Sequence, residues 1–103
     1  MPLPDPRDHH IPLERAAELT RHHRAAKSGE PHAEFFHRAA FERLLAQPGC
    51  AGIRVYRGRD AKGGHHLVLV GVDGNGDDMT ADGCMEEAFP CPPYCSEGSP
   101  LLK

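Results

Sequence analysis

Two stretches in the middle of the chain have the apolar patterns of β-strands. From Ile53 to Arg57 the side chains belong alternately to a more apolar and a more polar face, because successive side chains of a strand point to opposite sides of a sheet. The run Leu67–Val72, with the sequence LVLVGV, is apolar on both faces, which is typical of a strand covered on both sides. The glycine-containing segment 59–64 separates the two stretches. We therefore expect an antiparallel hairpin over residues 51–73.

The residues before the hairpin follow a helical period. The first predicted helix begins at Pro12, because proline suits the first helical position, and ends at Gly29. The second predicted helix begins at Pro31 and ends at Pro48–Gly49. Its apolar residues recur at helical spacing, at Phe36, Ala40, Phe41, Leu44 and Leu45.

The chain beyond the hairpin predicts short elements and an extended tail. Residues 79–81 are expected to form a short third strand, and Asp82 is expected to cap a short helix over residues 83–88. The prolines that follow Phe89 exclude a regular helix there. The predicted fold class is therefore α+β, with two N-terminal helices packed on an antiparallel β-hairpin or small sheet and an extended Pro/Cys-rich C-terminal tail. Residues 1–11 are expected to be a flexible N-terminal arm, and residues 12–103 a single domain.

Composition and charge exclude several classes of protein. The formal net charge is −3 over 103 residues, which argues against a dedicated nucleic-acid binder. The N-terminal residues lack the apolar core of a signal peptide, and no apolar run is long enough to span a membrane. We therefore expect a cytoplasmic protein with no membrane partner. The chain is rich in histidine, but its three His doublets do not chelate by themselves, because adjacent side chains point apart.

The four cysteines form one candidate site, at Cys50, Cys84, Cys91 and Cys95. In a reducing compartment they are expected to be reduced thiols or metal ligands rather than structural disulfides. Antiparallel pairing places Cys50 beside residues 72–73, where the tail begins, so all four thiols could gather at one end of the hairpin and bind zinc or copper. Two alternatives stay open. The C-x-x-x-C pair is compatible with a redox dithiol, and also with small buried cysteines beside a free or oxidised pair.

A second candidate site is a binding surface built from Arg54 and Tyr56 on the first strand and Tyr94 in the tail. Tyr56 is also the one aromatic residue among a wider set of basic residues, which fits a solvated helix face and strand edge better than an RNA or phosphate surface. These basic residues are Arg21, Arg24, Lys27, Arg54, Arg57 and Arg59. The acidic loop at Asp73, Asn75 and Asp77 is interpreted as a turn. No hydrolase nucleophile motif and no phosphate loop is present, so no catalytic residue is predicted.

These observations favour a small non-enzymatic accessory or binding module that acts through its sheet face or its C-terminal tail. Because edge strands invite pairing, a homodimer or another protein partner is expected to dock through the sheet. The alternative function is a thiolate metal-binding or dithiol redox protein that uses the four cysteines.

The hairpin and tail together form a longer pattern. A helix ends in a Pro-Gly-Cys turn, followed by a G-I-R-x-Y strand, an L-V-L-V-G-V-D strand, an acidic Gly/Asn turn and a C-P-P-x-C tail. Over residues 47–95 this pattern resembles a family of small uncharacterised bacterial proteins. The matching positions are Cys50, Gly52, Ile53, Arg54, Tyr56, Gly71, Val72, Asp73, Cys91, Pro92, Pro93 and Cys95. The resemblance implies no activity.

Overall fold

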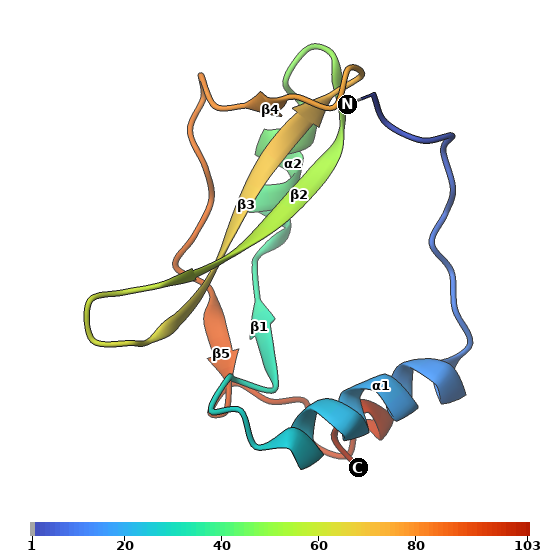
Figure 1. Cartoon of the computed structure of the whole chain (residues 1–103), viewed down its shortest axis with the longest axis vertical. Helices are drawn as coiled ribbons and strands as arrows, with labels where there is room; N and C mark the ends of the chain where they lie inside the picture. The colour runs from blue at the N-terminus through green and yellow to red at the C-terminus, as the bar shows by residue number, and fades with distance from the viewer. Residues whose placement is uncertain (1) are drawn as a thin grey trace. The chain divides into compact units, whose positions relative to one another are not determined.

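The structure is a computed structural model that describes residues 2–103. These residues contain two α-helices, one short 3₁₀ helix and two small antiparallel sheets, which confirms the predicted α+β class (Figure 1). The chain forms two compact units. We call the unit that contains Phe36–Ala88, with the residues up to Asp5, the hairpin unit. We call the unit that contains Pro6–Phe35 and Phe89–Lys103 the disulfide unit.

The hairpin unit is built on the predicted hairpin. Strand β2 (Cys50–Arg59) pairs antiparallel with β3 (His65–Asp73), and a short strand β4 (Asp78–Met79) pairs with the end of β3, so the strand order is β2-β3-β4. The register is interrupted once, by an irregularity between Cys50 and Gly52. The expected third strand therefore exists, although it begins one residue earlier than the sequence predicts.

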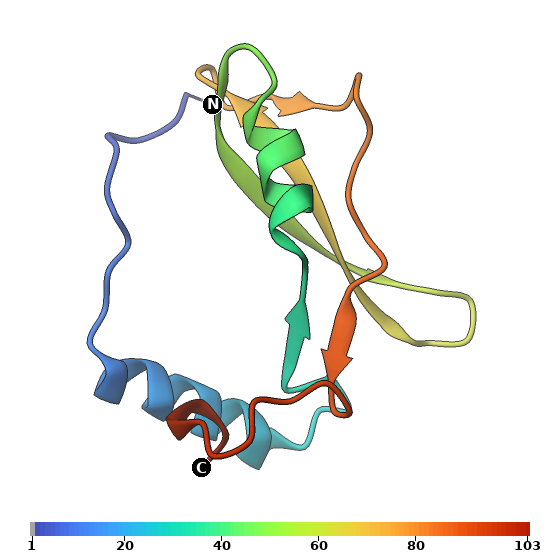
Figure 2. The ribbon, with the colours of Figure 1, turned by 180° about the vertical axis from the view of Figure 1, so that it is seen from behind.

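Helix α2 (Arg38–Leu45) contacts both strands of the hairpin (Figure 2). Leu44 is fully buried, and three β3 residues, Leu69, Val70 and Val72, are at most 4% exposed. A β-carbon at Gly71 of β3 would lie 2.6 Å from Nε2 of Gln47, which follows the helix, and 3.4 Å from the Leu44 carbonyl oxygen. Glycine at this position therefore permits these two close approaches.

The predicted start of the second helix is wrong. Helix α2 begins at Arg38 rather than at Pro31, and strand β1 (Ala33–Phe35) occupies part of the expected first turns. This strand pairs antiparallel with β5 (Phe89–Cys91), and the Phe35 and Phe89 rings lie 6.4 Å apart. Because the pairing partner lies far along the chain, the local apolar period could not reveal it.

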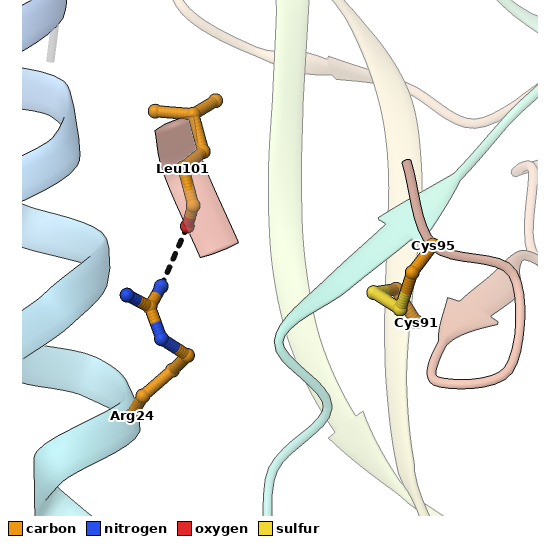
Figure 3. Close-up of a disulfide and its surroundings, with 4 residues drawn as sticks. All are labelled: Arg24, Cys91, Cys95 and Leu101. Atoms are coloured by element: carbon orange, nitrogen blue, oxygen red, sulfur yellow. Dashed lines mark hydrogen bonds between the residues drawn. A yellow bond between two sulfur atoms is a disulfide. The ribbon is translucent and has the colours of Figure 1, made fainter. Parts of the chain in front are cut away.

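The disulfide unit contains this second sheet and helix α1 (Leu13–Ala26). Helix α1 begins at Leu13, one residue after the predicted start at Pro12, which is its N-terminal cap. The helix ends before Gly29, where Lys27 adopts the left-handed conformation, with φ of 49°. The 3₁₀ helix η1 (Pro100–Leu102) contacts α1. Arg24 Nη1 donates a 2.5 Å hydrogen bond to the Leu101 carbonyl oxygen (Figure 3).

Residues 83–88 are not helical, so the predicted short helix is also wrong. The backbone N–H and C=O of Met85 both bond to Leu69 of β3, each at 2.8 Å. A residue that exchanges both bonds with a strand must be extended, which excludes a helix at this position. Among residues 2–103, no helix has the length and apolarity needed to cross a membrane.

Candidate functional site

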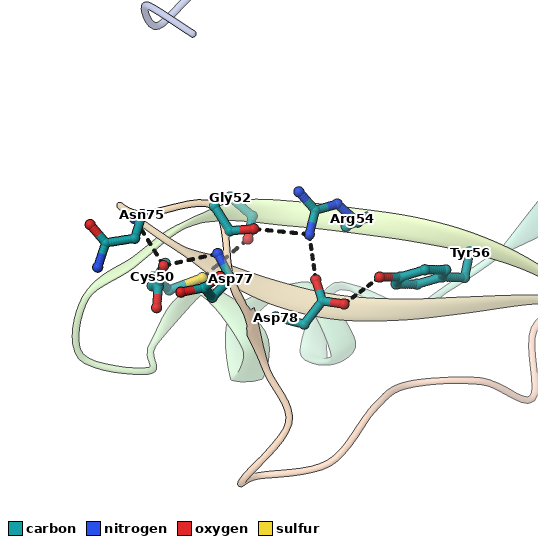
Figure 4. Close-up of polar contacts among 9 residues, drawn as sticks. Cys50, Gly52, Arg54, Tyr56, Asn75, Asp77 and Asp78 are labelled. Atoms are coloured by element: carbon teal, nitrogen blue, oxygen red, sulfur yellow. Dashed lines mark hydrogen bonds and ion pairs between the residues drawn. The ribbon is translucent and has the colours of Figure 1, made fainter. Parts of the chain in front are cut away.

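One face of the hairpin carries a tyrosine and an arginine held by a shared aspartate. Arg54 and Tyr56 are two residues apart on β2, so they project from the same face. Arg54 Nη1 donates to Asp78 Oδ1 at 2.5 Å, and the Tyr56 hydroxyl donates to Asp78 Oδ2 (Figure 4). Arg54 Nη1 also donates to the Gly76 carbonyl oxygen at 3.2 Å. The structure thus joins two of the predicted binding residues through Asp78, which the sequence analysis did not assign to a site.

The charges and hydrogen bonds of this cluster suit a role in positioning the Tyr56 ring better than a role in catalysis. The hydrogen bond from Tyr56, assisted by Arg54, holds the pKa of Asp78 below its usual value. The same hydrogen bond to Asp78 raises the pKa of the Tyr56 phenol. Near neutral pH the cluster therefore holds a neutral phenol, a carboxylate and a guanidinium. A phenol with a raised pKa is a poor general base, so the cluster holds the Tyr56 ring in place rather than activating it.

Exposed side chains line the outer strand of the same hairpin. Val55 and Tyr56 are 52% and 46% exposed, and they point to opposite faces because they are adjacent in β2. Arg57 and Arg59 are also exposed. Among the strands of residues 2–103, β2 pairs only with β3, so it is an edge strand. This strand therefore combines unpaired backbone groups with exposed apolar and cationic side chains.

His66 joins the hairpin loop to the segment after β4. Its Nε2 lies 2.8 Å from Asp60 Oδ2 and its Nδ1 lies 2.8 Å from Glu86 Oε1. Asp60 Oδ1 also accepts hydrogen bonds from the Lys62 and Gly64 backbone N–H groups, both at 2.9 Å. Because both ring nitrogens are engaged, His66 is arranged as a structural link rather than as a catalytic base. The sequence analysis missed this cluster, although the hairpin register places His66 beside the loop that contains Asp60.

The His66 cluster is strongest in mildly acidic solution. Hydrogen bonds to Asp60 and then Glu86 raise the pKa of His66, so this stabilisation is complete below pH ~6.5 and is lost as the pH rises through the raised value. The hydrogen bond from His66, with those from Gly64 and Lys62, lowers the pKa of Asp60 to about 2. Its stabilisation is complete above pH ~4 and is lost as the pH falls toward that value.

The four cysteines have different states in the two units. Cys91 and Cys95 form a disulfide with a Cα–Cα distance of 4.8 Å (Figure 3), so the expectation of reduced thiols is wrong for this pair. The turn between them brings the two residues within the range that a disulfide requires. Cys50 and Cys84, in the hairpin unit, are free. As predicted, Cys50 lies opposite Asp73 in the hairpin register.

The structure does not test the metal site that the sequence predicts at the four cysteines. While the disulfide is closed, Cys91 and Cys95 have no thiolate to offer a metal. Residues 2–103 contain no group of three or more His, Cys, Asp or Glu side chains placed to hold a metal ion. Zinc or copper binding by the cysteines therefore stays a prediction.

The third predicted binding residue, Tyr94, lies in the disulfide unit. It is 62% exposed and packs edge-on against Phe89, with ring centroids 5.3 Å apart.

The acidic loop after β3 is a turn, as interpreted from the sequence. Asp73 Oδ1 accepts hydrogen bonds from the backbone N–H groups of Asn75 at 2.9 Å and Asp77 at 3.1 Å (Figure 4). Asp73 thereby stabilises the turn that brings β4 back beside β3, and this turn delivers Asp78 to Arg54 and Tyr56.

Comparison with protein-family models, with curated proteins and with solved structures finds no significant match to this chain.

Proposed function

We propose that this chain is a non-enzymatic protein-binding module that adds an extended, acidic segment of a partner protein to the outer edge of β2. The observation that supports this function best is the length of that edge. Strand β2 has ten residues and, among residues 2–103, no strand pairs with its outer side. Backbone N–H and C=O groups along such an edge bind an added strand through main-chain hydrogen bonds.

The side chains of β2 suit a strand that docks beside it. Val55 and Tyr56 offer apolar contacts on the two faces of the edge. The bond from Tyr56 to Asp78 already orders the ring, so binding loses less side-chain entropy there. We further propose that α2 covers one face of the hairpin, because Leu44 is buried and Gly71 lies against the helix. A partner strand would then meet the edge rather than that face.

The charge of β2 favours an acidic partner over a second copy of the chain. The strand contains three arginines, Arg54, Arg57 and Arg59, and no acidic residue, although Arg54 forms an ion pair with Asp78 of β4. Pairing β2 with β2 of another copy would bring two arginine-rich strands together, and like charges on neighbouring strands are destabilising. An acidic strand would instead place opposite charges across the new pairing.

Selection of peptides from a displayed random library against the immobilised chain tests this function. We expect enriched sequences to be acidic, rich in β-branched residues and free of proline, because these features suit an added strand. Binding of a selected peptide should weaken as salt is raised, and NMR titration should shift the amide signals of β2 most.

The matched variants are two double charge reversals. Arg57→Glu with Arg59→Glu should abolish binding of the selected peptides, whereas Arg15→Glu with Arg38→Glu changes the net charge equally and should leave binding intact. Failure to enrich any peptide, or enrichment that both variants reduce equally, would refute strand addition at β2. Preferential binding of single-stranded RNA would indicate a nucleic-acid surface instead, and β2-dependent dimers would indicate self-pairing.

A further inference from the structure

A cavity in the disulfide unit has a cationic side. Its volume is about 620 Å³, and it is lined by residues from the end of α1, from the following turn and from β5 and the residue after it. Four of the lining side chains are basic: His23, Arg24, Lys27 and His32. A volume of this size lies within the range of ~300–1,000 Å³ that is usual for small-molecule sites.

The cationic side is arranged by the helix and by the C-terminal segment. His23 and Arg24 belong to the last turn of α1 and Lys27 is its C-terminal cap, and all three line the cavity. Arg24 donates hydrogen bonds to the carbonyl oxygens of Leu101 at 2.5 Å and Lys103 at 2.6 Å, which hold its guanidinium in place. These two bonds use only part of the donor capacity of a guanidinium, so Arg24 can also bind an anion.

The charges in the cavity are not balanced by acidic residues. Glu30 is the one carboxylate in the lining, and His23 Nδ1 lies 4.0 Å from its Oε2. No acidic side chain among residues 2–103 pairs with Lys27. Among the side chains that line the cavity, Arg24 and Lys27 are permanent cations and Glu30 is a carboxylate, while Arg24 also bonds to the backbone oxygen of Lys103, the last residue. His23 Nε2 lies 3.1 Å from the Pro31 carbonyl oxygen, so the nitrogen that faces this carbonyl carries the proton.

The lining also has an apolar part. Pro31, Pro90 and Pro92 belong to it, and their rings offer rigid surface without hydrogen-bond donors. Basic residues near the C-terminal end of a helix also complement the helix dipole, and this effect by itself would account for the presence of Arg24 and Lys27. The helix dipole does not explain why His32 and three prolines from other segments line the same cavity. A ligand with an anionic end and a ring would account for both the basic residues and the prolines of the lining.

We propose that this cavity binds a small phosphate monoester that carries a ring, with the phosphate at Arg24, Lys27 and His32 and the ring against the prolines. A phosphate monoester carries about −1.5 to −2 charges at neutral pH and three acceptor oxygens, which match the cations of Arg24 and Lys27 and the imidazole N–H donors. Apolar walls with a few convergent polar groups are the usual composition of such sites. The proposal does not depend on β2, because all the residues involved belong to the disulfide unit.

NMR titration of the ¹⁵N-labelled chain tests the proposal with three probes: inorganic phosphate, adenosine 5′-monophosphate and adenosine. Both phosphate-containing probes should shift the amide signals of residues 23–32, and the nucleotide should bind more tightly than phosphate because its ring contacts the prolines. Adenosine should bind more weakly than the nucleotide, because it lacks the charge. Higher salt should weaken nucleotide binding.

Two variants, one at the C-terminal cap of α1 and one within the helix, distinguish binding in the cavity from a general effect of positive charge. Lys27→Gln removes a cation of the cavity and should weaken nucleotide binding about tenfold, because charge-assisted hydrogen bonds are among the stronger polar contacts. Arg21→Gln removes the same charge from the same helix outside the lining and should leave the affinity within about twofold. The absence of shifts with both phosphate probes at about 10 mM would overturn the proposal. Equal losses in the two variants, or equal binding of adenosine and the nucleotide, would overturn it too.

Discussion

Leu44→Ala tests the packing of α2 on the hairpin most directly. Leu44 is fully buried and is one of only four buried apolar side chains in the described part of the hairpin unit, with Leu69, Val70 and Val72. Burial of a leucine contributes about 1.5–3 kcal/mol, and the cavity left by alanine raises the usual cost to about 2–5 kcal/mol. A unit of this size is expected to have a stability of only about 3–8 kcal/mol. The substitution should therefore remove a large part of the stability of the hairpin unit.

Urea unfolding followed by tyrosine fluorescence and circular dichroism measures this effect. With a denaturant dependence of about 1 kcal/mol per molar urea, the midpoint should fall by at least about 2 M. Leu45→Ala is the matched control, because Leu45 is the next residue of α2 and is 52% exposed. Its cost should be at most about 1 kcal/mol, since only part of its side chain is buried.

Equal midpoints for Leu44→Ala and Leu45→Ala would refute the placement of α2. If Leu44→Ala does not fold, Leu44→Met keeps the test decisive, because this swap nearly conserves volume and usually costs less than about 1.5 kcal/mol. A folded Leu44→Met with an unfolded Leu44→Ala is the pattern expected of a tightly packed site.

Three further predictions concern the polar clusters and the disulfide. The urea midpoint of the wild-type chain should fall between pH 6 and pH 8 more than that of His66→Gln, because Asp60 raises the pKa of His66 in the folded state; equal slopes would contradict this coupling. Cys95→Ser should destabilise the disulfide unit by about 2 kcal/mol, the chain-entropy value for so short a loop, and an unchanged melting curve would contradict that cost. Tyr56→Phe should raise the pKa of Asp78 in carboxyl ¹³C NMR titrations, because the phenol hydrogen bond is the main cause of its lowered value; an unchanged Asp78 titration would show that Arg54 alone sets it.

The sequence analysis located the elements whose signals are local. The two strands of the hairpin were identified from the alternation after Ile53 and the continuous run from Leu67, and the loop between them from its glycines. Period-two patterning and turn residues act within a few positions, so a single sequence suffices to find them. For the same reason Pro12 located the start of α1 to within one residue. The opposition of Cys50 and Asp73 followed from the antiparallel pairing alone.

Contacts between distant segments were decided by the tertiary structure. Residues Ala33–Phe35 follow an apolar pattern that a helix would also use, and only their pairing with Phe89–Cys91 makes them a strand. Asp78 could be assigned to Arg54 and Tyr56 only once the turn had brought β4 back beside β3.

By itself, the sequence determined the α+β class, the hairpin and the basic character of β2, because these depend on neighbouring residues and on composition. Only the tertiary structure decided which cysteines are bonded, which carboxylates hold His66 and Tyr56, and which residues line the cavity at the end of α1. The physical reason is that such contacts depend on how the chain returns to itself. A side chain offers the same donors and acceptors wherever it stands, and the fold determines which of them meet.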